Sequence, residues 1–120
     1  MIRVLLVEDH AAFREALAFL LGREPDLEVV AQAGTLAEAR EVLDGRFDVA
    51  VIDLALPDGD GSELIFELRR ASPGISVLVL SATVKRGHLD DVRKIGAEAV
   101  LTKVDSPPII AEEVRRLAGG

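Results

Sequence analysis

The sequence predicts an α/β fold in which a five-stranded parallel sheet, in the order 2-1-3-4-5, lies between helices on both faces. Short apolar runs rich in Val, Leu and Ile alternate strictly with stretches that have the apolar spacing of helices. Right-handed crossovers leave few topologies for such an alternation. The 120 residues, 49% of them hydrophobic and 29% charged, are enough for one folded domain with a single core.

Strands are expected at five short apolar runs, which span residues 2–7, 27–33, 48–53, 75–80 and 98–101. The third run is almost entirely apolar, which is typical of a central strand buried on both faces. Glu28 and Gln32 interrupt the second run, as an edge strand would allow. We therefore choose the flavodoxin-like, three-layer arrangement, in which the second strand lies at the edge.

Helices are expected between and after the strands, over residues 10–23, 35–45, 62–71, 84–95 and 106–118. Thr35 and Glu38 have the spacing of a capping box, which begins a helix. Ser106 followed by two prolines is a further helix start, because the first helical turn tolerates the missing N–H of proline. Pro25 and the Ser72-Pro73-Gly74 turn close two other helices.

Composition excludes several classes of function. The net charge of -7 argues against nucleic-acid binding by this chain, because contact with phosphates needs a clustered basic surface. The absence of cysteine excludes disulfides and thiolate metal sites. The apolar run at the N-terminus is too short for a signal peptide or a membrane span, so we expect a cytoplasmic protein without membrane contact. Four Phe without Trp or Tyr disfavour a site that stacks a flavin, a base or a sugar.

Charged and polar side chains stand where four of the five expected strands end. These groups are Glu8-Asp9, Asp53, Ser81 and Lys103. Parallel strands bring their carboxyl ends to one edge of a sheet, which is where open α/β folds bind ligands. The groups could instead cap loops, with Lys103 bridging the acids for stability alone. Because such groups occur at four of the five strand ends, one shared site is favoured over separate loop caps.

The residue types at this edge indicate phosphoryl chemistry with a hard cation. Three carboxylates close together repel one another unless a cation lies among them, and Mg²⁺ suits oxygen ligands. A carboxylate can then attack phosphorus. Lys103 would neutralise a phosphoryl oxygen, and the Ser81 hydroxyl would bind another.

The whole chain resembles the receiver domain of bacterial two-component response regulators. The resemblance rests on Glu8-Asp9, on Asp53 with Pro57 and Gly61 at four and eight residues beyond it, on Ser81-Ala82 and on Lys103. Val7-Glu8-Asp9-His10 with Phe13-Arg14, and the segment 28–33, are similar to receivers attached to a LuxR-type helix-turn-helix.

The resemblance implies a role for each of these residues. It makes Asp53 the phosphoacceptor, with Ser81 and Lys103 in contact with the phosphoryl group. It gives Mg²⁺ four ligands: Glu8, Asp9, Asp53 and the backbone carbonyl of Ala55. Thr83 and Ala55 would tune the lifetime of the phosphoryl group. The partners it implies are a sensor histidine kinase, a second copy of the chain after phosphorylation, and DNA, reached only through a C-terminal output domain that is absent from this chain.

Two departures from the family and three alternatives remain. No output domain follows Gly120, so we expect either a stand-alone receiver or, as the LuxR-type features favour, a piece of a longer regulator. Val100 occupies the position where the family usually has Tyr or Phe, which allows the alternative of a phosphorylation-independent interaction module. An Asp-nucleophile phosphatase would have a second Asp two residues after Asp53, where this chain has Ala55, so we expect no turnover of an external substrate. A flavodoxin-type electron carrier would need aromatic walls around its flavin and a phosphate loop, and this sequence has neither.

Four further polar residues are given structural positions. His10 and His88 are expected at the surface or at helix caps, and Asp58 and Asp60 are expected in turns.

Overall fold

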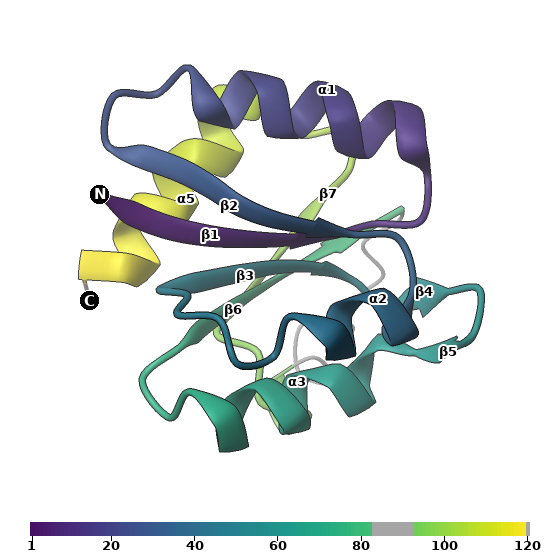
Figure 1. Cartoon of the computed structure of the whole chain (residues 1–120). Coiled ribbons are helices and arrows are strands. Elements are labelled where there is room, and N and C mark those ends of the chain that lie inside the picture. Colours follow the sequence, from purple (N-terminus) through teal and green to yellow (C-terminus); the bar gives the residue numbers. More distant parts are fainter. Residues whose placement is uncertain (83–92, 120) are drawn as a thin grey trace.

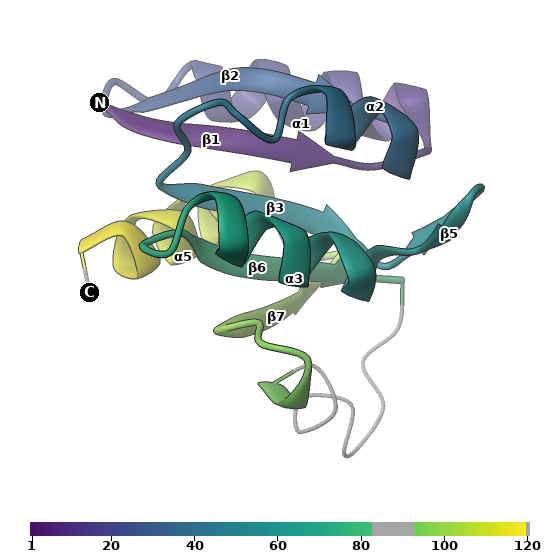
Figure 2. The same cartoon turned by 60° about the horizontal axis from the view of Figure 1, so that its bottom comes forward.

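The computed structural model describes residues 1–82 and 93–119, and these form three layers with the sheet in the middle (Figure 1). The five parallel strands of the sheet are β1 (Ile2–Val7), β2 (Leu27–Ala33), β3 (Val49–Asp53), β6 (Ser76–Ser81) and β7 (Ala99–Thr102). Their order is β2-β1-β3-β6-β7, which can be followed from top to bottom in Figure 2. The predicted order 2-1-3-4-5 is confirmed.

In the described part of the chain, four helices cover the two faces of the sheet: α1 (Ala11–Gly22), α2 (Leu36–Glu41), α3 (Gly61–Ala71) and α5 (Pro107–Gly119). The pair α1 and α5 lies on one face, and α2 and α3 lie on the other (Figure 1). The helix expected over 84–95 falls mostly outside the described residues. Within the described ranges, no helix has the length and apolar character needed to cross a membrane.

Each strand contributes side chains to two separate hydrophobic cores, one on each face of the sheet. In β1, Val4 and Leu6 pack with α1 and α5, while Leu5 and Val7 pack with α2 and α3. Successive side chains of a strand point to opposite faces, so a strand between two apolar layers must be apolar at every position. This requirement explains the uninterrupted apolar runs in the sequence.

Two elements differ from the expectation. Helix α2 ends at Glu41 rather than near Gly45, because Val42 and Leu43 leave the helix in turns that keep both side chains packed on the core. The segment after β3 contains a short antiparallel hairpin of β4 (Ala55–Leu56) and β5 (Gly59–Asp60), where only a loop was expected. The other described boundaries agree within one or two residues.

Aspartates of the hairpin cap two helices. Asp60 is the N-cap of α3 and accepts a hydrogen bond from Ser62 N at 2.9 Å. Asp58 accepts hydrogen bonds from Leu36 N at 2.8 Å and Ala37 N at 3.0 Å, so it caps α2 from a different loop. The hydrogen bond from Leu36 N is the main reason that the pKa of Asp58 is lowered. The two bonds of Asp58 connect the hairpin to α2, and the bond of Asp60 connects it to α3.

The apolar stripe of the last helix belongs mainly to the core. Ile110, Val114 and Leu117 are buried, whereas Ile109 is 48% exposed. Ile109 is therefore the member of this stripe that is left at the surface.

Gly61 provides the first test of this packing. A Cβ atom at this position would lie 2.9 Å from the carbonyl oxygen of Asp53 and 2.9 Å from the Cα of Leu54, and backbone atoms cannot easily move aside. We expect Gly61→Ala to lower the free energy of unfolding by about 1–3 kcal/mol, as overpacking does, in a urea titration. Gly74→Ala is the control, because nothing lies within 4 Å of its added Cβ. Equal stability of the two variants would contradict this packing.

Candidate functional site

The polar residues at the strand ends meet at one edge of the sheet, as predicted. Asp53 is the last residue of β3 and Ser81 the last of β6, while Glu8 and Lys103 directly follow β1 and β7. The strands are parallel and run in register, so these ends lie on the same side, beside the β4–β5 hairpin (Figure 2). The fold thus brings together residues separated by up to about a hundred positions in the chain.

Lys103 binds two of the carboxylates directly. Its Nζ lies 2.6 Å from Glu8 Oε1 and 2.9 Å from Asp53 Oδ2. Its backbone N–H donates to the carbonyl of Ser81 at 2.9 Å, and its ammonium lies 5.7 Å from the centroid of the Phe13 ring. Burial acts to lower the pKa of Lys103, but hydrogen bonds and attraction from Glu8 and Asp53 outweigh burial and raise it. The side chain therefore stays charged.

Glu8, Asp9 and Asp53 form an acidic cluster in which one carboxylate oxygen of each lies within 4.8 Å of the others. Glu8 is 1% exposed and Asp53 6%, whereas Asp9 is exposed. Burial raises the pKa of Glu8, despite the opposing effect of the nearby Lys103. Hydrogen bonding with the Glu8 carboxyl is the main cause that lowers the pKa of Asp9. The pKa values of Glu8 and Asp9 are thus shifted in opposite directions, with the exposed Asp9 the easier of the two to ionise.

The oxygens of this cluster fit a hard cation. Glu8 Oε1 is buried and is neutralised by the Lys103 ammonium 2.6 Å away. Glu8 Oε2 accepts from His10 N at 3.1 Å, and Asp53 Oδ1 accepts from Ala55 N at 3.0 Å. Lys103 supplies one positive charge to a cluster of three carboxylates, so a bound cation would relieve the repulsion that is left. The cluster is therefore compatible with a metal site made of oxygen ligands.

A cavity of about 260 Å³ lies beside Asp53. Its polar lining consists of Asp53, Ser81 and Lys103, and its other lining residues are Leu54, Ala55, Val79, Leu80 and Ala82. A carboxylate, a hydroxyl residue and an ammonium around one small space suit a tetrahedral anion attached to Asp53. Thr83, which was expected to border this site, lies outside the described residues.

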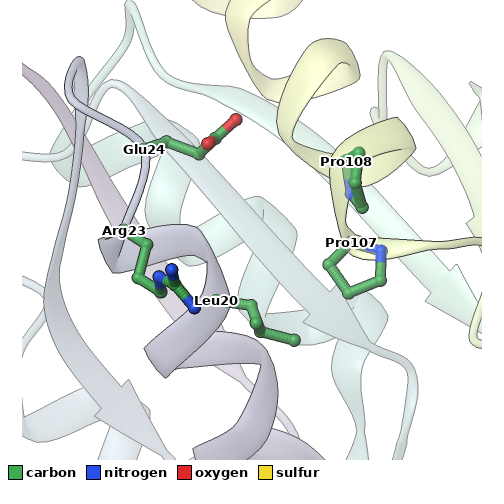
Figure 3. A pocket seen from close by; sticks show the side chains of 5 residues that line it. All are labelled: Leu20, Arg23, Glu24, Pro107 and Pro108. Carbon is green, nitrogen blue, oxygen red and sulfur yellow. The ribbon is translucent and has the colours of Figure 1, made fainter.

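A second cavity, of about 280 Å³, lies between the end of α1 and the start of α5 (Figure 3). Its lining residues are Leu20, Arg23, Glu24, Pro107 and Pro108. Glu24 is the single carboxylate of this lining, and its Oε1 lies 2.8 Å from Arg115 Nη2. Among the described residues, no second carboxylate and no hydroxyl residue lines this cavity, so the edge of the sheet, where three carboxylates gather, remains the candidate site.

Two residues of α1 support this site although their residue types and spacing predicted no chemical role for them. The Phe13 ring lies under the Lys103 ammonium, and Arg14 Nη1 donates to the carbonyl of Glu8 at 2.9 Å. Both had been quoted only as part of a resemblance. Their spacing in the helix could have suggested that they lie near the preceding loop, but not which atoms they contact.

Val100, at the position where an aromatic residue was expected, lies in β7 beside Val79 of β6. It is partly buried against the core under α2 and α3. His10, expected at the surface or at a cap, is exposed at the N-cap position of α1 without a side-chain capping bond. His88 lies outside the described residues.

Comparison with known proteins agrees with this geometry. Residues 4–115 match the family described as the response regulator receiver domain. The chain is 37% identical to the DNA-binding transcriptional activator DevR/DosR of Mycobacterium tuberculosis, covering 100% of this chain and 56% of that protein. It is 37% identical to the transcriptional regulatory protein UhpA of Salmonella typhimurium, with 100% and 60% covered.

Solved structures show the same likeness. The signal receiver domain of the response regulator NarL from Mycobacterium tuberculosis superimposes with a TM-score of 0.89 at 27% identity, covering 99% of this chain and 97% of that one. The chain thus spans somewhat more than half the length of the curated relatives, but nearly all of a solved receiver domain.

The ion pairs of Lys103 give a test of the site in the absence of metal. Lys103→Met keeps the length of the side chain but leaves Glu8 and Asp53 without their cation. We expect the free energy of unfolding to fall by about 1–3 kcal/mol in chelator-containing buffer, because buried carboxylates lose their partner. Added Mg²⁺ should restore part of this loss if it binds the folded state.

Lys94→Met is the matched control for this measurement, since Lys94 is exposed. A Lys103→Met protein as stable as the Lys94→Met protein would show that the ion pairs do not hold the cluster together.

Proposed function

Because the chain belongs to the response regulator receiver domain family, we propose that Asp53 is the phosphoacceptor of this two-component receiver. The observation that carries this proposal is the setting of Asp53. Its carboxylate ends a central strand, is 6% exposed, and lies between the Lys103 ammonium and the cavity that Ser81 lines. Among the three carboxylates of the cluster, Asp53 is the one that borders this cavity.

The proposed reaction is a displacement at phosphorus. A carboxylate oxygen of Asp53 forms a bond to the phosphorus of the donor, while the bond from phosphorus to the donor's nitrogen or oxygen breaks and its electron pair leaves with the donor. Lys103 would exchange part of its contact with Asp53 for a phosphoryl oxygen. The Ser81 hydroxyl would donate to another of these oxygens.

Glu8, Asp9, Asp53 and the backbone carbonyl of Ala55 would hold Mg²⁺, which when bound supplies positive charge next to the phosphoryl oxygens. The support for this ligand set is the cluster of three carboxylates, to which Lys103 supplies only one positive charge. Ala55 belongs to β4, directly beside the cavity, and its N–H orients the Asp53 carboxylate.

We propose that the phosphorylated chain is a signal and not an enzyme intermediate. Phosphorylation and slow dephosphorylation of Asp53 itself would be its only chemistry. Ala55 stands two residues after Asp53, where a phosphatase of related fold would carry a general acid. The alternative, a phosphorylation-independent interaction module, draws its support from Val100, which is too small to move as an aromatic switch would.

The relatives suggest partners for the whole protein. Two of them are named as a DNA-binding transcriptional activator and a transcriptional regulatory protein, and each is longer than this chain. We propose that a sensor histidine kinase in the cytoplasm donates the phosphoryl group, and that a C-terminal output domain acts on DNA. A homodimer that forms on phosphorylation would be the link between the two.

Phosphorylation of Asp53 can be read from the intact mass of the protein after incubation with acetyl phosphate and Mg²⁺. We expect the wild type to gain one phosphoryl group and Asp53→Asn to gain none. Asp60→Asn is the control, since Asn caps a helix as well as Asp does and Asp60 lies in the adjacent hairpin. An unmodified wild-type mass would leave the interaction module as the remaining function.

The ligand role of Asp9 has a separate test. Asp9→Ala should remove Mg²⁺ binding and phosphorylation while leaving the fold intact, because Asp9 is exposed and its loss relieves like-charge repulsion. Calorimetric titration with Mg²⁺ and the rate of phosphorylation by acetyl phosphate measure both effects. Asp44→Ala, at an exposed turn before β3, should behave as wild type. Phosphorylation of Asp9→Ala at the wild-type rate would refute the assignment.

A further inference from the structure

The loop between β1 and α1 carries both Glu8 and Asp9 and is held by a small number of hydrogen bonds. Glu8 N donates to the carbonyl of Ala33 at 2.9 Å, and Glu8 Oε2 accepts from His10 N at 3.1 Å. The carbonyl of Glu8 accepts from Arg14 Nη1 at 2.9 Å. Glu8 is thus held at its N–H, its side chain and its carbonyl, and Arg14 supplies the last of these contacts.

The Arg14 side chain is partly desolvated in this position. It is half-buried, and its Nε is buried without a hydrogen-bond partner among the described residues. An arginine near the start of a helix can normally extend its guanidinium into solvent, where all five N–H groups are hydrated. A buried Nε without a partner is unfavourable, so packing around the guanidinium must hold it in place.

Gly34, at the end of β2, provides the space for that guanidinium. A Cβ atom on Gly34 would lie 2.8 Å from Arg14 Nη1 and 3.4 Å from Glu38 Oε1. Glu38 Oε1 also accepts a hydrogen bond from Gly34 N at 2.6 Å. The bare backbone of Gly34 therefore lies directly against the donor that binds the Glu8 carbonyl.

We propose that Arg14 is a positioning residue for the acid pair, with Gly34 as the surface on which its guanidinium rests. The carbonyl of Glu8 and the N–H of Asp9 belong to one planar peptide unit. A hydrogen bond that fixes this carbonyl therefore fixes the direction in which the chain enters Asp9. Asp9 lies beyond the sheet and is exposed, so no strand pairing orients it. Arg14 thereby aims the Asp9 carboxylate at Glu8 and Asp53.

The inference rests on the proposed function, since it takes Glu8 and Asp9 as ligands of Mg²⁺. Outer groups that orient metal ligands commonly contribute 10–100-fold to affinity. Since Arg14 acts through the backbone, we expect Arg14→Gln to weaken Mg²⁺ binding roughly tenfold, at the lower end of that range. Arg14→Lys should recover part of this loss, because the lysine retains one donor on a long side chain.

Gly34→Ala perturbs the same contact without changing Arg14. The added Cβ meets the flexible end of a side chain, so the guanidinium should move while the fold is retained. We expect a comparable loss of Mg²⁺ affinity. In the Arg14→Gln background, Gly34→Ala should add little further loss, because the contact it disturbs is already gone.

Two control variants lie at the C-terminal end of α1. Arg23→Gln removes an exposed arginine that is 5.9 Å from the Phe19 ring. Gly22→Ala adds a Cβ with nothing within 4 Å. Both should bind Mg²⁺ as the wild type does.

Calorimetric titration of the full chain with Mg²⁺ alone measures the affinities, and backbone amide shifts of residues 8–10 in metal-free protein report the loop itself. We expect these shifts to change in Arg14→Gln and Gly34→Ala but not in the controls.

Wild-type affinity and unchanged loop shifts in both variants would overturn the role of Arg14, while phosphorylation of Asp53 would stand. If Arg14→Gln does not fold, Gly34→Ala and its shifts decide alone. A wild type that binds no Mg²⁺ would refute the ligand assignment itself.

Discussion

The bridge from Lys103 to Glu8 and Asp53 is the interaction on which the site depends. Three carboxylates that lie within 4.8 Å of one another repel, and two of them are almost fully buried. Lys103 follows the edge strand β7, yet its ammonium contacts side chains at the ends of β1 and β3. The long side chain crosses the end of β6, where Ser81 lies. Lys103, at the end of β7, therefore links the other three strand ends that carry chemistry: its ammonium contacts Glu8 and Asp53, and its backbone N–H bonds the carbonyl of Ser81.

The sheet makes this bridge possible because its two faces stabilise the fold through apolar packing, while its polar residues gather at one edge. Each inner strand packs on two apolar cores, so its polar residues are confined to the end of the strand. At that end the chain must pass closely beside the site, and two glycines permit this. Gly61 packs against the backbone of Asp53, and Gly34 packs against the guanidinium that binds the carbonyl of Glu8.

The sequence predicted those features that follow from local patterns. Apolar runs marked the strands because both faces are covered, and the strand ends marked the site. Contacts between distant segments could not be predicted in this way. Asp58 caps α2 across 21 and 22 residues, and the packing of Val42 and Leu43 ends that helix early. Glu8 and Asp9 are neighbours in sequence, but only the position of the sheet edge makes one buried and the other exposed.

The most direct test of the central claim is a crystal structure of the protein with Mg²⁺ and beryllofluoride, which mimics a phosphoryl group. We expect beryllofluoride on the Asp53 carboxylate, with Lys103 Nζ and the Ser81 hydroxyl in contact with its fluorines. The ion should contact Glu8, Asp9 and Asp53, directly or through water. Beryllofluoride on another carboxylate, or Lys103 still bound to both Glu8 and Asp53 with no ion beside them, would contradict the claim.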